Sequence, residues 1–136
     1  MIVVDTGPLY AAADTSDTHH AACAAIFSKP PDQLLVPVSV VVEASFPIKR
    51  HLGPPAEARF LQALATSGLA IEQLGEDDLQ RMAQLVATYS DLPLGAVDAS
   101  VIAIAERTGA TTLLSLDRRH FSIVRPRHTQ AFTLLP

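Results

Sequence analysis

The hydrophobic positions of the chain form short apolar runs that alternate with longer segments of helical period. The runs at residues 2–5, 34–38, 69–74 and 111–116 are too short for helices and favour buried strands. Between them, apolar residues recur every three or four positions in segments that start near residues 17, 40, 55, 76 and 98. This alternation predicts one α/β domain over residues 1–136 with a mainly parallel sheet.

Local signals predict where several of these elements end. Residues 6–8, Thr-Gly-Pro, predict a turn after the first strand. The helix from Val40 is expected to be disturbed at Pro47, because proline cannot donate a helical hydrogen bond. Gly109 fits the position just past a helix end, where the backbone turns left-handed. The tail contains two short β-prone pieces at residues 123–124 and 131–135.

Composition narrows the class of protein. Apolar residues make up 49% of the chain, yet no run approaches the roughly 20 residues that cross a bilayer, so we expect no membrane segment. The N-terminal residues do not resemble a signal peptide, and the single cysteine, Cys23, excludes an internal disulfide. A cytoplasmic protein is therefore expected, with Cys23 as a small core residue.

The charge balance leaves the question of nucleic-acid binding open. The formal net charge is −4, which does not indicate a nucleic-acid-binding protein. Four of the ten Lys and Arg residues nevertheless lie within ten positions, at Arg118, Arg119, Arg125 and Arg127. This cluster is either a solvated basic edge or a contact surface for phosphate.

Four acidic residues in apolar surroundings are predicted to lie at one edge of the sheet. Asp5 and Asp117 end the first and last buried strands, and Asp98 opens a helix that starts from the same edge. Glu43 lies about one turn into the helix after the second strand. Ligands of parallel sheets bind at the carboxyl ends of the strands. Taken singly, Asp98 is an ordinary first-turn helix residue and Asp117 an ordinary turn former.

Convergence of these acids would require a compensating positive charge. Two carboxylates at about 4–6 Å repel by roughly 3–4 kcal/mol at an effective dielectric constant near 20. Several such pairs would rival the whole folding free energy, so the cluster predicts protonation or a bound cation. Oxygen ligands without a cysteine or histidine set select Mg²⁺ or Mn²⁺, ions that serve phosphoryl chemistry. We interpret His51, His120 and His128 as surface groups, with His120 within possible reach of a phosphate.

The same segments carry a family resemblance that spans essentially the whole chain. Residues 2–9, the Glu43 helix, residues 97–106 and residues 113–121 resemble the PIN domain, and more narrowly the VapC toxins of toxin–antitoxin pairs. With the alternating pattern, this resemblance implies a twisted, mainly parallel sheet flanked by helices. It also implies a Mg²⁺-dependent endoribonuclease, with Mn²⁺ as a possible substitute. Such a toxin is usually a homodimer and is silenced by a VapB-type antitoxin.

The resemblance also assigns roles to residues. Asp5, Asp98 and Asp117 would be metal-site carboxylates, and Glu43 would complete the catalytic quartet. Thr6 and Ser115 match the small hydroxyl residues that often flank this site, while Pro47 departs from the usually uninterrupted helix that bears the glutamate. The remaining residues are the candidates for RNA contact, Arg118 and Arg119, and an unassigned acid near the same edge, Asp91.

Two other classes of protein remain open. A receiver-like signalling domain also holds Mg²⁺ at strand ends, but it needs an acidic pair after the first strand and an aspartate ending the third. Asp5 has no acidic neighbour, and the third run ends at Leu74-Gly75. The other alternative is a non-catalytic PIN-like module that binds RNA or a partner protein, against which the presence of all four acids argues.

Overall fold

A five-stranded parallel sheet forms the centre of the computed structural model, which describes all residues 1–136. Its strands are β1 (Ile2–Val4), β2 (Leu34–Pro37), β3 (Ala70–Glu72), β4 (Thr112–Leu114) and β5 (Thr133–Leu135), in the order β3-β2-β1-β4-β5. In the centre, Val3 of β1 pairs with Leu35 of β2 and with Leu113 of β4. The α/β class predicted from the sequence is thus confirmed, and the sheet is parallel throughout.

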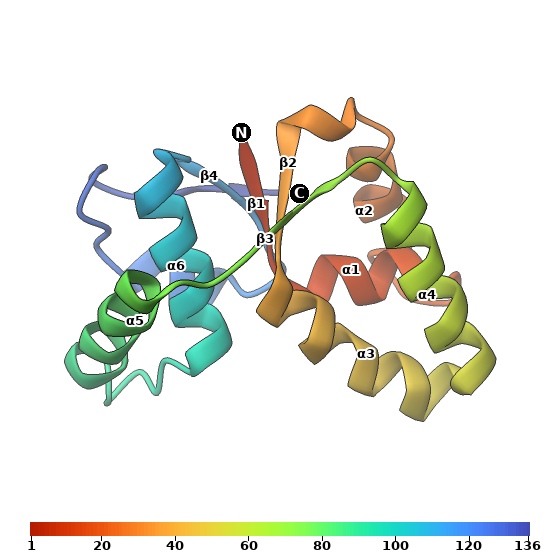
Figure 1. Cartoon of the computed structure of the whole chain (residues 1–136), viewed down its shortest axis with the longest axis horizontal. Helices are drawn as coiled ribbons and strands as arrows, with labels where there is room; N and C mark the ends of the chain where they lie inside the picture. The colour runs from red at the N-terminus through yellow and green to blue at the C-terminus, as the bar shows by residue number, and fades with distance from the viewer.

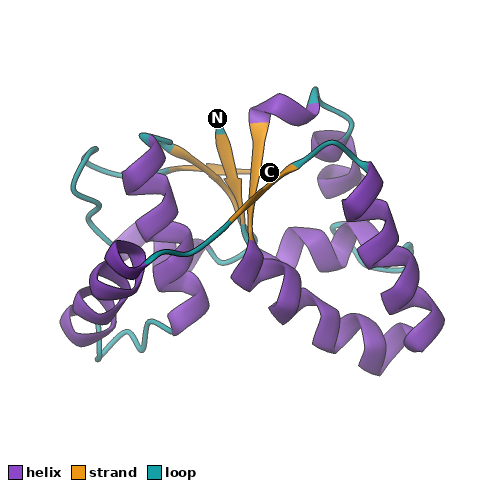
Figure 2. Cartoon of the chain, in the orientation of Figure 1, coloured by secondary structure: helices purple, strands orange, loops and turns teal.

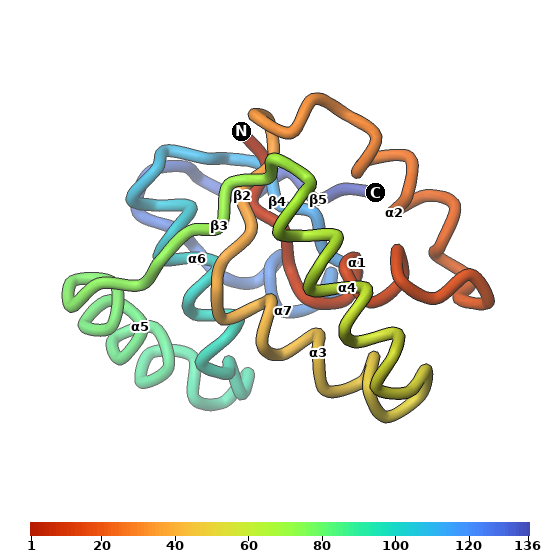
Figure 3. Tube along the Cα trace, turned by 45° about the vertical axis from the view of Figure 1, so that its right-hand side comes forward, coloured from red at the N-terminus to blue at the C-terminus, as the bar shows by residue number.

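Helices cover the sheet in two groups. Figure 1 shows α5 (Glu76–Thr88) and α6 (Ala96–Thr108) on one side of the strands and the first four helices on the other. Figures 2 and 3 show the strands between these groups from two directions. The first four helices are α1 (Thr6–Ala13), α2 (His20–Phe27), α3 (Val38–Leu52) and α4 (Pro54–Thr66). A 3-10 turn, η1 (Pro31–Gln33), precedes β2, and a short helix, α7 (Arg118–Ile123), follows β4.

The strand order reverses between β1 and β4. The chain moves outward from β1 through β2 to β3 and then returns to the other side of β1 with β4 and β5. Helix α3 starts directly after β2, one residue separates β1 from α1, and three residues separate β4 from α7. In sheets of this kind, the crevice at such a reversal is the usual position of a ligand site.

Helix α6 is the most deeply buried helix of the fold. All seven residues from Ala99 to Ala105 are buried, so this helix lies between the sheet and α5 rather than on the surface. It ends at Gly109, whose φ of 74° is the left-handed conformation that the sequence predicted. Val101, Ile102 and Ala105 are fully buried on this helix, and their packing fixes the position of Asp98 one turn earlier.

Three local predictions were wrong. Residues 6–8 are not a turn but the start of α1, where Pro8 is tolerated because first-turn amides need no helical partner. Helix α3 begins at Val38 rather than Val40 and continues through Pro47 without interruption. Residues 123–124 do not form a strand but end α7, the short helix whose N-terminus Asp117 caps.

Some apolar side chains of the helices face solvent. Leu61 of α4 is 44% exposed, and Leu79 of α5 is 55% exposed while Leu85 of that helix is buried. Cys23 is fully buried, as expected.

No helix of the structure combines the length and the apolar character that a bilayer crossing requires.

Candidate metal centre and active site

Asp5 is a buried carboxylate at the end of the central strand. Its side chain is held at the switch in strand order because its own amide donates to the carbonyl of Leu114 in the neighbouring strand at 2.9 Å. The residue is only 6% exposed, and burial raises its pKa to about 6. The hydrogen bond from Ser115 opposes this shift, whereas the charges of Asp98 and Glu43 add to it. Asp98 and Glu43 are therefore close enough to act on Asp5.

A short hydrogen-bond chain connects Asp5 with the loop after β4. Ser115 Oγ donates to Asp5 Oδ2 at 2.7 Å, and the amide of Asp117 donates to Ser115 Oγ at 2.9 Å. Ser115 is fully buried, so this chain is screened from water. The small hydroxyl residue that the resemblance singled out thus holds Asp5 and positions the backbone of Asp117.

Asp98 and Asp117 meet at a third residue, His120. The Nδ1 atom of His120 lies 2.8 Å from Asp117 Oδ2 and 3.1 Å from Asp98 Oδ2. One ligand atom from each of the three residues lies within 4.8 Å of the other two. Asp5 and Glu43 are not part of this close group. Burial raises the pKa of Asp98, and the nearby charge of Asp117 adds to the rise.

The N-terminus of α7 fixes the relation between Asp117 and His120. Asp117 is the N-cap, and its Oδ1 accepts the amide of His120 at 3.0 Å. The second oxygen, Oδ2, is thereby turned toward the imidazole ring three residues later. Our interpretation of His120 as a surface group was wrong, since its side chain is only 21% exposed. The signal that could have revealed it is the Asp-x-x-His spacing, which places both side chains on one helical face.

Helix α3 brings Glu43 to the same region, and a pair of serines fixes that helix against α6. Ser39 Oγ lies 2.6 Å from Ser100 Oγ, and Ser100 Oγ donates to the carbonyl of Val97 at 2.6 Å. Ser39 is the second residue of α3, so this contact joins the start of α3 to the N-terminal half of α6. Glu43 itself is exposed, so its carboxylate is accessible to solvent.

The residues present fit a divalent cation. Two carboxylates and an imidazole nitrogen converge, and these are donors that first-row and alkaline-earth ions accept. Burial is the main reason why the pKa values of Asp5 and Asp98 are raised, so both carboxylates lack hydration that a bound cation would replace. Thr6 Oγ1, adjacent in sequence to Asp5, is the single buried side-chain polar atom without a hydrogen-bond partner.

The basic cluster is largely engaged within the fold. Arg118 donates to the carbonyl of Pro136 at 2.6 Å, and Arg127 donates to Gln84 at 2.8 Å. Arg125 donates to the carbonyl of Ser122 at 2.9 Å. Arg119 is exposed and its guanidinium makes no bond within the chain, so it is the arginine of this cluster that is free for a ligand.

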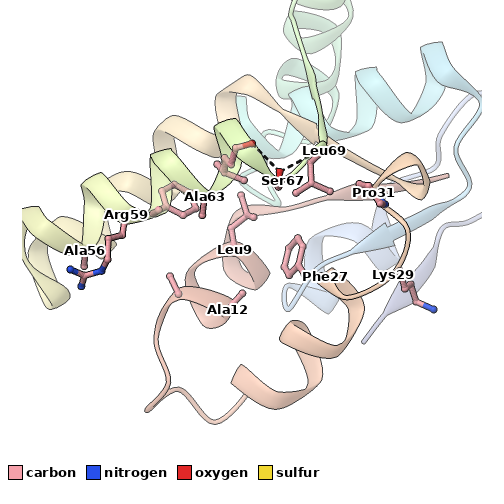
Figure 4. A pocket seen from close by; sticks show the side chains of 13 residues that line it. Leu9, Ala12, Phe27, Lys29, Pro31, Ala56, Arg59, Ala63, Ser67 and Leu69 are labelled. Carbon is pink, nitrogen blue, oxygen red and sulfur yellow. Dashed lines mark hydrogen bonds between the residues drawn. The ribbon is translucent and has the colours of Figure 1, made fainter.

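A separate apolar pocket lies between α1, α2 and α4. Its volume is about 390 Å³, and Leu9, Phe27 and Ala63 are among the nine hydrophobic residues that line it. Figure 4 shows Lys29 and Arg59 near opposite ends of this pocket, with Leu9 and Phe27 between them. None of the acidic candidate residues lines it, so the pocket is distinct from the carboxylate site.

Sequence comparison finds a family model and a relative that each match most of the chain. The family model for the PIN domain matches residues 2–125. The chain is 33% identical over 135 residues to ribonuclease VapC26 of Mycobacterium tuberculosis, and the aligned region covers 99% of this chain and 100% of that protein.

Solved structures share the fold. The M. tuberculosis VapC20, a toxin that cleaves the sarcin–ricin loop, superposes with a TM-score of 0.83 at 20% identity, over 96% of this chain and 99% of that one. The FitAcB structure from Neisseria gonorrhoeae gives a TM-score of 0.67 at 15% identity, over 100% of this chain and 97% of that one.

Proposed function

Because the chain belongs to the PIN domain family, we propose that it is the toxin of a type II toxin–antitoxin pair and acts as a Mg²⁺-dependent endoribonuclease. The observation that carries this proposal is the meeting of Asp98 and Asp117 beside the end of β1, where Asp5 is buried. The full-length similarity to a ribonuclease supports RNA as the substrate. The protein would act in the cytoplasm, where such RNA is found.

Each residue of the site has a proposed part in the reaction. Asp98 and Asp117 would hold the cation, and Asp5, held by Ser115, would complete the carboxylate ligands. When bound, Mg²⁺ would polarise a phosphate oxygen and lower the pKa of water. Glu43 is exposed beside Asp5 and would take up the proton of the attacking water. Arg119 would contact the RNA backbone, and Arg118 would do so only by leaving Pro136.

The partners follow from the same proposal. A VapB-type antitoxin would place an apolar helix in the pocket between α1, α2 and α4, whose cationic ends suit acidic residues flanking that helix. A homodimer is also expected. Val42 and Phe46 of α3 are 56% and 72% exposed, and they are the apolar surface that a second copy would cover.

An RNA cleavage assay with the purified chain tests the proposed function. We expect Mg²⁺-dependent cleavage by the wild type and a loss of at least about 100-fold in Asp98→Asn, which keeps the shape but removes a ligand charge. Asp91→Asn is the control, because Asp91 is an exposed acid between α5 and α6 whose side chain makes no hydrogen bond with the site. Arg119→Ala should weaken RNA binding and reduce its salt dependence while metal affinity stays the same.

The outcome also separates the alternatives. If the wild type binds RNA but never cleaves it with Mg²⁺ or Mn²⁺, the chain is a non-catalytic binding module. If Asp98→Asn cleaves as fast as the wild type, any activity arises at another site.

A further inference from the structure

We propose that His120 is a nitrogen ligand of the metal centre, beside Asp98 and Asp117, and that it makes the centre prefer Mn²⁺ to Mg²⁺. This inference rests on the proposed metal-dependent function and deepens it. The carboxylates alone would form an all-oxygen site, which suits Mg²⁺. A nitrogen ligand changes the choice of ion and therefore the condition under which the protein is active.

The spacing of the three ligand atoms suits one shared ion. Nδ1 of His120 is 2.8 Å from Asp117 Oδ2 and 3.1 Å from Asp98 Oδ2, and ligand atoms of all three residues lie within 4.8 Å of one another. Neighbouring ligands of an octahedral ion with bonds of about 2.1 Å are about 3 Å apart. The atoms therefore stand at the separations that adjacent ligands adopt, with only small movements required.

The three residues come from elements that hold them in place. Asp98 is in the first turn of α6, whose following seven residues are buried. Asp117 and His120 are held together by the N-cap hydrogen bond from the His120 amide to Asp117 Oδ1. This bond uses one oxygen of Asp117 and leaves Oδ2 directed to the ring. The ligands are thus positioned before any ion arrives, which lowers the entropic cost of binding.

Nδ1 of His120 faces two carboxylate oxygens at once. A ring nitrogen carries at most one proton, so Nδ1 cannot make a full hydrogen bond to both carboxylates. Nε2 of His120 makes no hydrogen bond within the chain. The proton of a neutral ring can therefore stay on Nε2, toward solvent or substrate, which leaves the lone pair of Nδ1 for an ion.

The donor set then determines the preference among ions. Imidazole nitrogen binds first-row transition ions more strongly than it binds Mg²⁺, which retains oxygen ligands and water. A site with two carboxylates and one imidazole keeps the oxygen ligands that Mn²⁺ accepts and adds one that Mg²⁺ disfavours. Mn²⁺ should therefore bind more tightly than Mg²⁺, and His120 should be the cause.

Pulsed electron paramagnetic resonance of bound Mn²⁺ tests the ligand directly. With Mn²⁺ below the protein concentration, we expect nitrogen coupling in the wild type and its loss in His120→Asn, which offers an amide at a similar reach. His51→Ala is the matched control, because His51 is exposed and belongs to no carboxylate cluster. Its spectrum should match that of the wild type.

Metal affinities, measured by calorimetry, provide the second measurement. His120→Asn should lower the ratio of Mn²⁺ to Mg²⁺ affinity by at least about tenfold, while His51→Ala leaves it unchanged. Melting of the metal-free proteins verifies that each variant is folded, and His120→Gln replaces His120→Asn if it is not. If Mn²⁺ binds without nitrogen coupling, or if the coupling persists in both His120 variants, the inference is wrong and metal dependence stands. If neither ion binds, the proposed metal centre itself is wrong.

Discussion

At the scale of single residues, burial of the ionised Asp5 carboxylate lowers the free energy of unfolding. A carboxylate buried at the end of the central strand loses its hydration, and its one side-chain hydrogen bond, from Ser115, does not fully replace it. The pKa therefore rises from 3.8 to about 6, so that at neutral pH the carboxylate is ionised without the hydration that it would have in water. Such an arrangement is expected where a cation is to be bound.

The effect on stability should depend on pH. The raised pKa of Asp5 means that the folded state binds the proton more tightly than the unfolded state does. The stabilisation of the folded state by the protonated Asp5 is complete below pH 3.8 and is lost as the pH rises through about 6. The free energy of unfolding changes by about 3 kcal/mol over this range. In urea unfolding without divalent ions, Asp5→Asn should therefore exceed the wild type in stability at pH 8, with the difference shrinking toward pH 4.5.

Asp32→Asn is the control for this experiment, because Asp32 is exposed in η1, and it should behave as the wild type at both pH values. Saturating Mn²⁺ or Mg²⁺ should reverse the order, since only the wild type retains the full set of carboxylates. A variant less stable than the wild type at pH 8 without ions would mean that Asp5 has a structural role.

The sequence predicted the acids but not the residue that joins them. Asp5, Asp98 and Asp117 could be placed at one edge because strand ends and helix starts in a parallel sheet meet there. His120 was missed because Asp117 was interpreted as a turn former and residues 123–124 as a β-prone piece, and in such a segment residues three apart do not share a face. Once Asp117 is an N-cap, the same spacing brings His120 to Asp98.

At the scale of elements, α3 departs from an ideal helix because a proline lies in its interior. Pro47 lies in its interior and has no amide hydrogen, so the carbonyl of Glu43, four residues earlier, receives no helical hydrogen bond. The helix nevertheless runs from Val38 to Leu52, because Val40, Ala44 and Ile48 are buried on one face. Packing therefore outweighs the local preference, which is why the sequence alone overestimated the disturbance.

Replacing this proline should reveal the cost of its position. Pro47→Ala restores a donor for the Glu43 carbonyl and removes the ring from its path, so the free energy of unfolding should rise by roughly 1–2 kcal/mol. Cleavage should fall, since the turn that carries Glu43 tightens. Urea unfolding and the RNA assay measure the two effects. Pro54→Ala is the control: Pro54 is the first residue of α4, where proline is favourable, so no gain is expected there.

A loss of stability in Pro47→Ala would show that the ring contributes packing that exceeds its cost to the helix.

At the start of α1, the sequence predicted a turn where the structure has a helix. Thr-Gly-Pro is a common turn sequence, but at residues 6–8 it forms the first turn of a helix that packs on α2 and α3. Contacts distant in sequence decided between two locally acceptable structures.

At the scale of the whole molecule, the fold separates the carboxylate site from the apolar pocket. The carboxylates lie at the ends of β1 and β4, whereas the pocket lies among helices on one side of the sheet. The alternation of strands and helices was enough to predict the class of fold. The pocket was not predictable, because it depends on how α1, α2 and α4 pack rather than on the pattern within any one of them.

This separation allows the proposed binding of an antitoxin and the proposed cleavage of RNA to be tested independently. Ala63 is an exposed residue of α4 that lines the pocket, and Ala65 is an exposed residue of the same helix that does not. Glutamate is a good helix former, so Ala63→Glu should leave the fold intact while placing a charge against the apolar face of a bound helix.

We expect Ala63→Glu to weaken binding of the cognate antitoxin by at least about tenfold, equivalent to roughly 1.4 kcal/mol, and to leave cleavage unchanged. Ala65→Glu should bind as the wild type does. Titration calorimetry with the antitoxin, beside the cleavage assay, measures both. Equal weakening in the two variants would indicate a general effect of charge on α4, and unchanged binding in Ala63→Glu would place the antitoxin on another surface.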